Sequence, residues 1–148
     1  MDLRLIPATP ADYPALEPMA IDFKIDDPEP RSERELLALR ALLADPGLGA
    51  VYRIAGDDRT IGYAILCWCY SVEYGGRDAI FDEFYILPEL RGRGLGLRVL
   101  DLLADDARQR GVVAISLEVL AYEARNFNLY TRAGYTDRGS RLMTRRLG

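Results

Sequence analysis

The stretch Phe81-Asp82-Glu83-Phe84-Tyr85-Ile86-Leu87-Pro88-Glu89-Leu90-Arg91-Gly92-Arg93-Gly94-Leu95-Gly96 decides the fold of this chain of 148 residues. It reads as a strand that Pro88 closes, a glycine-rich loop, and the start of a helix. Glycines let backbone N–H groups turn inward, and a helix N-terminus adds unpaired donors and positive potential. The loop from Arg91 to Gly96 therefore suits a pyrophosphate, to which Arg91 and Arg93 add positive charge.

Spacing excludes two better-known phosphate loops. There is no Gly-Lys-Ser/Thr, so the loop is not a P-loop, and Leu97 and Val99 stand where a dinucleotide fingerprint needs its third Gly or Ala. On these residues alone, a glycine-rich turn that binds no ligand remains the alternative.

The residues before this stretch predict one strand and two helices. Leu3 to Pro7 alternates between apolar and polar residues, which favours a strand. Thr9-Pro10-Ala11-Asp12 is typical of a helix start and predicts a helix over about 10–23. Ser32-Glu33-Arg34-Glu35 is a capping box that opens a second helix, which Asp45-Pro46-Gly47 ends.

The middle of the chain changes to the period of strands. Segments 51–55, 60–70 and 79–87 are predicted as an antiparallel meander, with turns at Gly56–Arg59 and Tyr74–Arg77. The glycine-rich loop then leads into a helix over about 94–110.

The last third predicts a parallel strand, a helix and a final strand. Val112 to Leu120 is apolar and rich in β-branched residues, as expected for a buried strand reached by a crossover. A helix over 123–133 with Gly134 after its end and a strand over 139–147 follow. We therefore expect one α/β (α+β) domain over residues 1–148, with a mixed, mostly antiparallel central sheet flanked by helices.

Composition narrows the chemistry. Apolar residues make up 49% and charged residues 28%, and no histidine is present, so proton transfer must use carboxylates, Tyr, Cys or Lys. The net charge of −4 opposes non-specific binding to nucleic acid or an anionic membrane.

Cys67 and Cys69 are expected to be reduced core thiols, and no metal site is expected. The C-terminal arginines are expected on a solvated strand face, at Arg138, Arg141, Arg145 and Arg146.

Neither a membrane span nor a signal peptide is predicted. No window approaches the roughly 18 consecutive apolar residues of a membrane helix, and Met1-Asp2-Leu3-Arg4 lacks the regions of a signal peptide. We expect a cytoplasmic protein, and the sequence is compatible with a homodimer.

Three separated motifs carry a resemblance to a known family. Arg91, Gly94 and Gly96 fill the spacing of the pyrophosphate loop of the GNAT superfamily of acyl-CoA-dependent N-acyltransferases, and the apolar lead-in to Pro88 matches as well. Downstream, Leu129-Tyr130-Thr131-Arg132-Ala133-Gly134-Tyr135 resembles the family's helix end. The order of predicted strands resembles the family over almost the whole chain.

The resemblance implies binding of acetyl-CoA or a related acyl-CoA and transfer of its acyl group to an amine. The residues that it implies for cofactor binding are the loop itself, the strand end before it, and one residue of the last helix: Tyr85, Ile86, Leu87, Arg91, Gly92, Arg93, Gly94, Leu95, Gly96 and Asn126. The backbone around Ile86 and Leu87 is expected to pair with the pantetheine arm, and one N–H is expected to polarise the thioester carbonyl. Family members often carry Asn and Ala where this chain has Glu123 and Asn126, and a capping or solvent-facing role for Asn126 stays open.

The resemblance also implies an acid and a base. A strand carboxylate six residues before the Pro takes the base role, which points to Asp82, with Glu83 as the reserve because it faces the other side of a regular strand. Tyr130 matches the tyrosine that donates a proton to the departing thiolate. A surface charge at Asp82 and a core role for Tyr130 are the alternatives.

The acceptor is expected to be a primary amine of a small molecule or peptide. Asp22, Asp26, Asp27 and Glu29 lie between the first two predicted helices, a region that the resemblance places over the acceptor cleft, so we expect a small, cationic acceptor. A solvated acidic loop is the alternative. A catalytically silent acyl-CoA sensor and a protein-interaction module are the other functions that these features allow.

Overall fold

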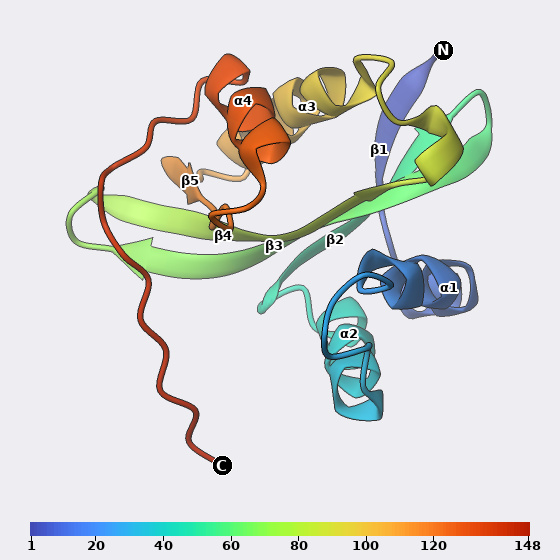
Figure 1. The fold of residues 1–148 in the computed structure, drawn as a ribbon, viewed down its shortest axis with the longest axis horizontal. Coiled ribbons are helices and arrows are strands. Elements are labelled where there is room, and N and C mark those ends of the chain that lie inside the picture. Colours follow the sequence, from blue (N-terminus) through green and yellow to red (C-terminus); the bar gives the residue numbers. More distant parts are fainter.

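The computed structural model describes residues 1–148 and shows a twisted sheet between two pairs of helices (Figure 1). The strands lie in the order β1-β2-β3-β4-β5, and their bounds are β1 (Leu3–Pro7), β2 (Gly49–Gly56), β3 (Arg59–Ser71), β4 (Gly76–Ile86) and β5 (Ala114–Ser116). The first four pair antiparallel, and β4 pairs with β5 in parallel. The prediction of a mixed, mostly antiparallel sheet is confirmed.

Helices cover both faces of the sheet. On one side lie α1 (Tyr13–Phe23), which follows a short 3₁₀ turn η1 (Pro10–Asp12), and α2 (Glu33–Ala44); on the other lie α3 (Leu95–Gln109), after a second 3₁₀ turn η2 (Pro88–Leu90), and α4 (Ala124–Arg132) (Figure 1). The capping box forms as predicted, because the Glu35 N–H donates to Ser32 Oγ at 3.2 Å and the Ser32 N–H donates to a Glu35 carboxylate oxygen at 3.4 Å.

The sheet separates two apolar cores. Leu66 of β3 packs into the larger core with Val99 and Leu103 of α3. Its neighbour Ile65 points to the opposite face and packs with Leu16 of α1 in the second core. Because both faces of the central strands are buried, the register of the sheet is strongly specified.

A β-bulge interrupts the pairing of β3 with β4. Ile65 pairs with Glu83 and Leu66 pairs with Phe81, so Asp82 between them has no partner residue on β3. A bulge bends a strand and re-aims the side chain that it carries. It changes the direction of Asp82 at the point where the two strands β4 and β5 separate.

The separation of β4 from β5 follows from the shortness of β5. Residues Ala114–Ser116 pair with Asp78–Ile80 and go no further, so the second half of β4 has no neighbouring strand on that side. The predicted strand over 112–120 is therefore correct in place and direction but much shorter in the structure.

The predicted strand over 139–147 is wrong. This segment runs away from the body without strand pairing (Figure 1), and Leu142 and Met143 are exposed. Adjacent apolar residues point to opposite faces of a strand, so this segment offers no single apolar face to bury. The C-terminal arginines are solvated as expected, although not on a strand, and Arg138, which precedes this segment, pairs with Glu73 at 2.6 Å.

The cysteine prediction holds for one residue of two. Both thiols are free, but Cys67 is half-buried and Cys69 is exposed. Cys69 lies in the part of the β3–β4 hairpin that extends past the helices, next to the exposed Tyr70, so a core position for Cys69 is wrong. None of the helices has both the length and the apolar character of a membrane span.

Candidate active site

The glycine-rich loop has the backbone geometry of an anion site. Gly92 and Gly94 adopt left-handed φ values of +75° and +78°, a conformation that L side chains rarely adopt. Gly94 is the N-cap of α3, a helix of 15 residues whose first N–H groups have no partner within the helix. These N–H groups and the helix dipole form a geometry that suits a pyrophosphate, and binding at this loop stays a prediction.

Three arginines surround the loop, and each plays a different part. The Arg91 Nε–H donates to the carbonyl oxygen of Ile86 at 2.7 Å, and its guanidinium lies over the Tyr85 ring, 5.1 Å from the centroid. Arg91 therefore braces the loop against β4. Arg93 is exposed. Arg125 of α4 reaches over the loop, because a Cβ on Gly92 would stand 3.3 Å from its Nη2. Sequence reasoning missed Arg125, which only the packing of α4 brings to the loop.

Leu95 contributes its backbone to the loop, and Gly96 leaves space for a neighbouring helix. The Leu95 side chain is buried in the larger core, so only its backbone faces the loop. Gly96 leaves room for α4, because an added Cβ would meet Leu129 Cδ2 at 3.2 Å.

The open edge of β4 offers fewer free groups than the sequence predicted. The Leu87 N–H donates to the carbonyl oxygen of Ile61, and the Leu87 carbonyl accepts from the Leu90 N–H, both at 2.9 Å. Since successive residues of an antiparallel ladder turn to opposite edges, the Ile86 groups face away from β3. The Ile86 carbonyl already accepts from Arg91, so among the backbone groups of Ile86 and Leu87 the Ile86 N–H is the donor left for a ligand.

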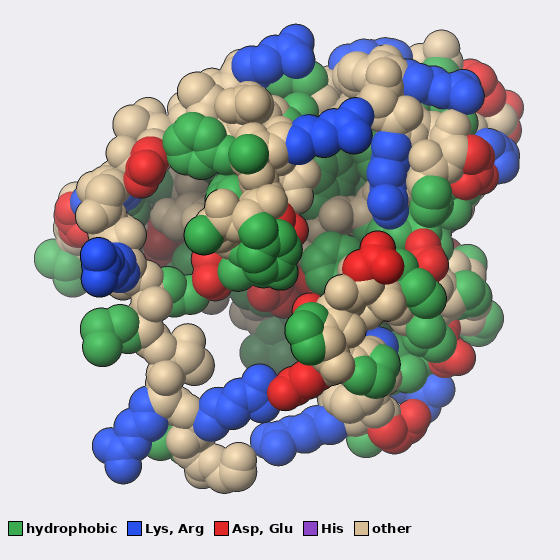
Figure 2. All heavy atoms as spheres, viewed as in Figure 1, with side chains coloured by type: hydrophobic (Ala, Val, Ile, Leu, Met, Phe, Trp, Pro, Cys, Tyr) green, Lys and Arg blue, Asp and Glu red, His purple; other side chains and the backbone are tan.

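A hollow of about 110 Å³ opens beside this edge, where β4 and β5 separate. Figure 2 shows the face hollowed near its centre, with acidic side chains around the depression. The lining comes from α1, β4, the segment after β5, and α4: Phe23, Phe81, Asp82, Phe84, Leu117, Glu118, Glu123, Asn126 and Tyr130. Three residues that the sequence singled out, Asp82, Asn126 and Tyr130, thus line one hollow.

A larger hollow of about 300 Å³ lies elsewhere, between η1, α1 and α2. Its lining consists of Pro10, Tyr13, Pro14, Arg40 and Leu43. It holds no carboxylate and none of the predicted site residues. The smaller hollow is therefore the candidate for chemistry.

The pKa of the Tyr130 hydroxyl keeps it protonated at neutral pH, as a proton donor must be. Burial, and then the negative charge of Glu123, raise the pKa of its phenol to about 12. Its ring packs edge-on against Phe81 and Tyr135, with centroids 6.4 and 5.7 Å away. At neutral pH the hydroxyl is therefore protonated, and the ring is packed against its aromatic neighbours.

Asp82 and Glu83 differ in their surroundings. Asp82 is exposed and lines the hollow. The Glu83 carboxylate accepts from Arg31 Nη1 at 2.9 Å, from Arg31 Nη2 at 2.7 Å and from the Tyr63 hydroxyl at 2.8 Å. The two carboxylates lie on different faces of β4, and Glu83 is already fully occupied.

Two of the three carboxylates of the hollow were not predicted as site residues. Glu118 and Glu123 join Asp82 in its lining, and no Lys or Arg does. Glu118 lies two residues after β5, so its place at the strand end was the signal that could have revealed it. None of the four acidic residues predicted near the acceptor lines the hollow, and Asp22 lies within α1, where its carboxylate accepts from the Tyr85 hydroxyl.

Comparison with known proteins agrees with this fold. Residues 15–135 match the model of the acetyltransferase (GNAT) family. An IAA acetyltransferase of Azospirillum brasilense is 29% identical over 119 residues, which cover 80% of this chain and 74% of that protein. A thialysine N-epsilon-acetyltransferase of Mus musculus is 30% identical over 77 residues, 52% of this chain and 45% of that protein. The chain thus spans about half the length of the mouse relative.

A solved structure extends the likeness to almost the whole chain. An integron cassette protein from the mobile metagenome of Cole Harbour Salt Marsh superposes with a TM-score of 0.84 at 29% identity, over 97% of this chain and 90% of that one. Because the family match spans the loop, the hollow and α4, the chain belongs to the acetyltransferase (GNAT) family.

Proposed function

We propose that this protein is an N-acetyltransferase that transfers the acetyl group of acetyl-CoA to a primary amine of a small molecule or peptide by direct attack. One observation carries the proposal: Asp82 and Tyr130 line one hollow, and this hollow adjoins both the open edge of β4 and α4, which packs on the glycine-rich loop. A cytoplasmic protein that is compatible with a homodimer remains our expectation.

The residues present fit acetyl-CoA, which would supply the activated acyl group. The N–H groups of the loop Gly92 to Gly96, with Arg93 and Arg125, would hold the pyrophosphate. The Ile86 N–H on the open edge would bind the pantetheine arm or polarise the thioester carbonyl. Asn126 lines the hollow and offers an amide to the same ligand.

Proton transfer is assigned to two side chains of the hollow. An amine attacks only when uncharged, so a carboxylate must take its proton, and Asp82 is the exposed carboxylate on β4. Tyr130 then donates to the departing thiolate, a role that its protonated phenol permits. Glu118 shares the hollow and is the competing base.

The state of Cys67 supports direct attack. Burial, followed by the charge of Asp82, raises the pKa of the Cys67 thiol to about 11. A thiol of this pKa is neutral at pH 7 and a weak nucleophile. A covalent acyl-enzyme on this residue is therefore disfavoured.

The lining of the hollow favours a cationic amine carried by an apolar or aromatic group. Three carboxylates attract a protonated amine, and the rings of Phe23, Phe81 and Phe84 can contact an apolar neighbour. The name of the mouse relative specifies an ε-amino acceptor, and an ε-amine is cationic at neutral pH.

The test combines calorimetry with an assay of thiol release over a panel of amines, amino acids, antibiotics and peptide N-termini. Acetyl-CoA should bind and at least one amine should be acetylated. Asp82→Asn and Tyr130→Phe should each lower turnover by roughly 10²–10⁴ with cofactor affinity little changed. Full activity of Asp82→Asn with a large loss in Glu118→Gln would move the base to Glu118. Binding without turnover of any amine would identify a silent acyl-CoA sensor instead.

A further inference from the structure

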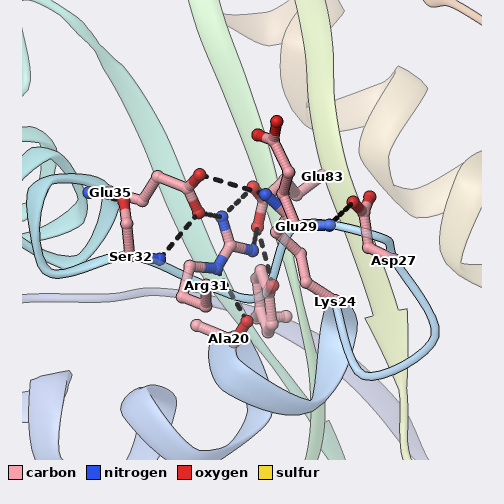
Figure 3. A network of polar contacts seen from close by, with 9 residues as sticks. Ala20, Lys24, Asp27, Glu29, Arg31, Ser32, Glu35 and Glu83 are labelled. Atoms are coloured by element: carbon pink, nitrogen blue, oxygen red, sulfur yellow. Dashed lines mark hydrogen bonds and ion pairs between the residues drawn. The ribbon is translucent and has the colours of Figure 1, made fainter.

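Arg31, in the segment between α1 and α2, has an environment unlike that of a surface arginine. Its side chain is only 8% exposed. The Nε–H donates to the Ala20 carbonyl oxygen at 2.8 Å, and Nη1 donates to Glu35 at 3.2 Å and to Glu83 at 2.9 Å, while Nη2 donates to Glu83 at 2.7 Å (Figure 3). One guanidinium thus joins the end of α1, the start of α2 and the middle of β4.

Glu83 is the anchor of this arrangement. Its carboxylate accepts two bonds from Arg31 in the bidentate geometry that arginine favours, and a third from the Tyr63 hydroxyl. Burial opposes the charge of Arg31, but the hydrogen bonds and charge of Glu83 outweigh it and hold the pKa of the guanidinium above its ordinary value. A carboxylate so engaged is poorly placed to take a proton from a substrate.

Arg31 also reaches the wall of the hollow through Phe23. The Arg31 guanidinium lies over the Phe23 ring, 5.5 Å from its centroid, and the Tyr63 ring lies 6.4 Å from the same ring. Phe23 is the last residue of α1 and lines the hollow opposite α4. The position of this wall therefore depends on the contacts of Arg31.

We infer that Arg31 is a positioning residue for the acceptor, which fixes the Phe23 wall of the hollow and thereby selects the amine, and that Glu83 serves as its anchor and is not the base. This inference rests on the proposed function. It assigns opposite roles to two adjacent carboxylates: Asp82 faces the reacting groups, and Glu83 holds the segment that forms the acceptor side.

A second contact between α1 and β4 allows Arg31 to be replaced without unfolding the protein. The Tyr85 hydroxyl donates to Asp22, so α1 keeps one bond to β4 when Arg31 is lost. Lys24 also pairs with Glu35 at 3.0 Å and keeps the segment attached to α2. Arg31→Met should thus loosen the segment locally.

The test compares Arg31→Met and Glu83→Gln with a control, Arg53→Met. Arg53 is also part-buried in an ion pair, at 3.0 Å from Asp12 on the α1 side, but it is not among the residues that line the hollow. The substrate is the best amine of the panel. We expect kcat/KM for this amine to fall by roughly 10–100-fold in both test variants, through KM, with KM for acetyl-CoA unchanged. Arg31→Lys should recover only part of the loss, because it lacks the bidentate geometry.

Two further measurements separate positioning from general damage. Amide hydrogen exchange over residues 21–31 should accelerate in Arg31→Met and not in Arg53→Met. The acidic limb of the pH–rate profile should persist in Glu83→Gln, and loss of that limb would make Glu83 the base and overturn the assignment. Unchanged exchange over 21–31, or faster exchange with unchanged KM for the amine, would also overturn it. If the wild type acetylates no amine, the proposed function fails, while the exchange comparison still decides whether Arg31 holds the segment.

Discussion

Gly96 in the first turn of α3 lies against Leu129 of α4 so closely that a Cβ at position 96 would stand 3.2 Å from Leu129 Cδ2. Leu129 directly precedes Tyr130, whose side chain lines the hollow. The absence of a side chain in the glycine-rich loop therefore sets the position of the tyrosine to which we assign the acid role.

Replacing Gly96 should consequently impair chemistry more than cofactor binding. Gly96→Ala gains about 1 kcal/mol of helix propensity and needs a shift of only a few tenths of an ångström in a flexible Leu side chain, so stability and rate should change little. Gly96→Val adds two methyl groups against Leu129 and should lower kcat at least roughly tenfold by displacing Tyr130. Steady-state kinetics of both variants checks this. Equal rates for the two would show that α4 is not held by this contact.

Gly94 should be required for its backbone conformation rather than for space. Its φ is +78°, and an added Cβ would meet no atom within 4 Å. Gly94→Ala should cost roughly 1–2 kcal/mol or rearrange the loop, and calorimetry should show weaker binding of acetyl-CoA. Gly75 in the β3–β4 turn is a matched control, with φ +79° and no atom within 4 Å. Gly75→Ala should lose similar stability and no affinity, and equal affinity losses would show that the effect is not local to the loop.

The features that the sequence predicted well depend on neighbouring residues. The capping box at Ser32 and Glu35, the turn at Gly56–Arg59 and the glycine-rich entry to α3 each need only a few adjacent residues, and all three lie where expected. The prediction of a strand over 139–147 was wrong because the residues of one segment cannot show whether a partner strand exists.

The features that the sequence could not predict depend on contacts between distant segments. The bulge at Asp82 is a mismatch of register between two strands, so β4 alone carries no sign of it. Glu83 is occupied by Arg31, which lies 52 residues earlier. Glu118 and Arg125 join the site through the placement of β5 and α4. The spacing of the motifs thus predicted the candidate site residues, and the packing of distant segments determined which of them have no other partner.

Two partly buried tyrosines should limit stability at alkaline pH. Burial raises the pKa of Tyr130 and of Tyr135 to about 12, above the value of about 10 in an unfolded chain. Their stabilising contribution is therefore complete below about pH 10 and is lost as pH rises through about 12. The denaturant concentration at the unfolding midpoint should decrease as pH rises from 9 to 12 in the wild type. The decrease should be less steep in Tyr135→Phe. A parallel decline in both proteins would remove Tyr135 as a cause.

The charge of the hollow should control recognition of the acceptor, and the acidic segment between α1 and α2 should not. Glu118, Asp26 and Asp27 are all exposed, but only Glu118 lines the hollow. For a cationic amine, kcat/KM should fall as ionic strength rises, because the Debye length shrinks from about 30 Å at 0.01 M to about 8 Å at 0.15 M. Glu118→Gln should lower kcat/KM and weaken its dependence on salt.

The double variant Asp26→Asn/Asp27→Asn supplies the comparison, since it removes two charges where Glu118→Gln removes one. If attraction acted only through net charge, the double variant would have the larger effect. If the carboxylates of the hollow act at close range, Glu118→Gln will have the larger effect, because the energy of two charges falls with distance and with screening. Steady-state kinetics at two salt concentrations decides between these outcomes. An acceptor that responds to neither variant nor to salt would not be recognised as a cation, and one that binds better in Glu118→Gln would carry a negative charge beside its amine.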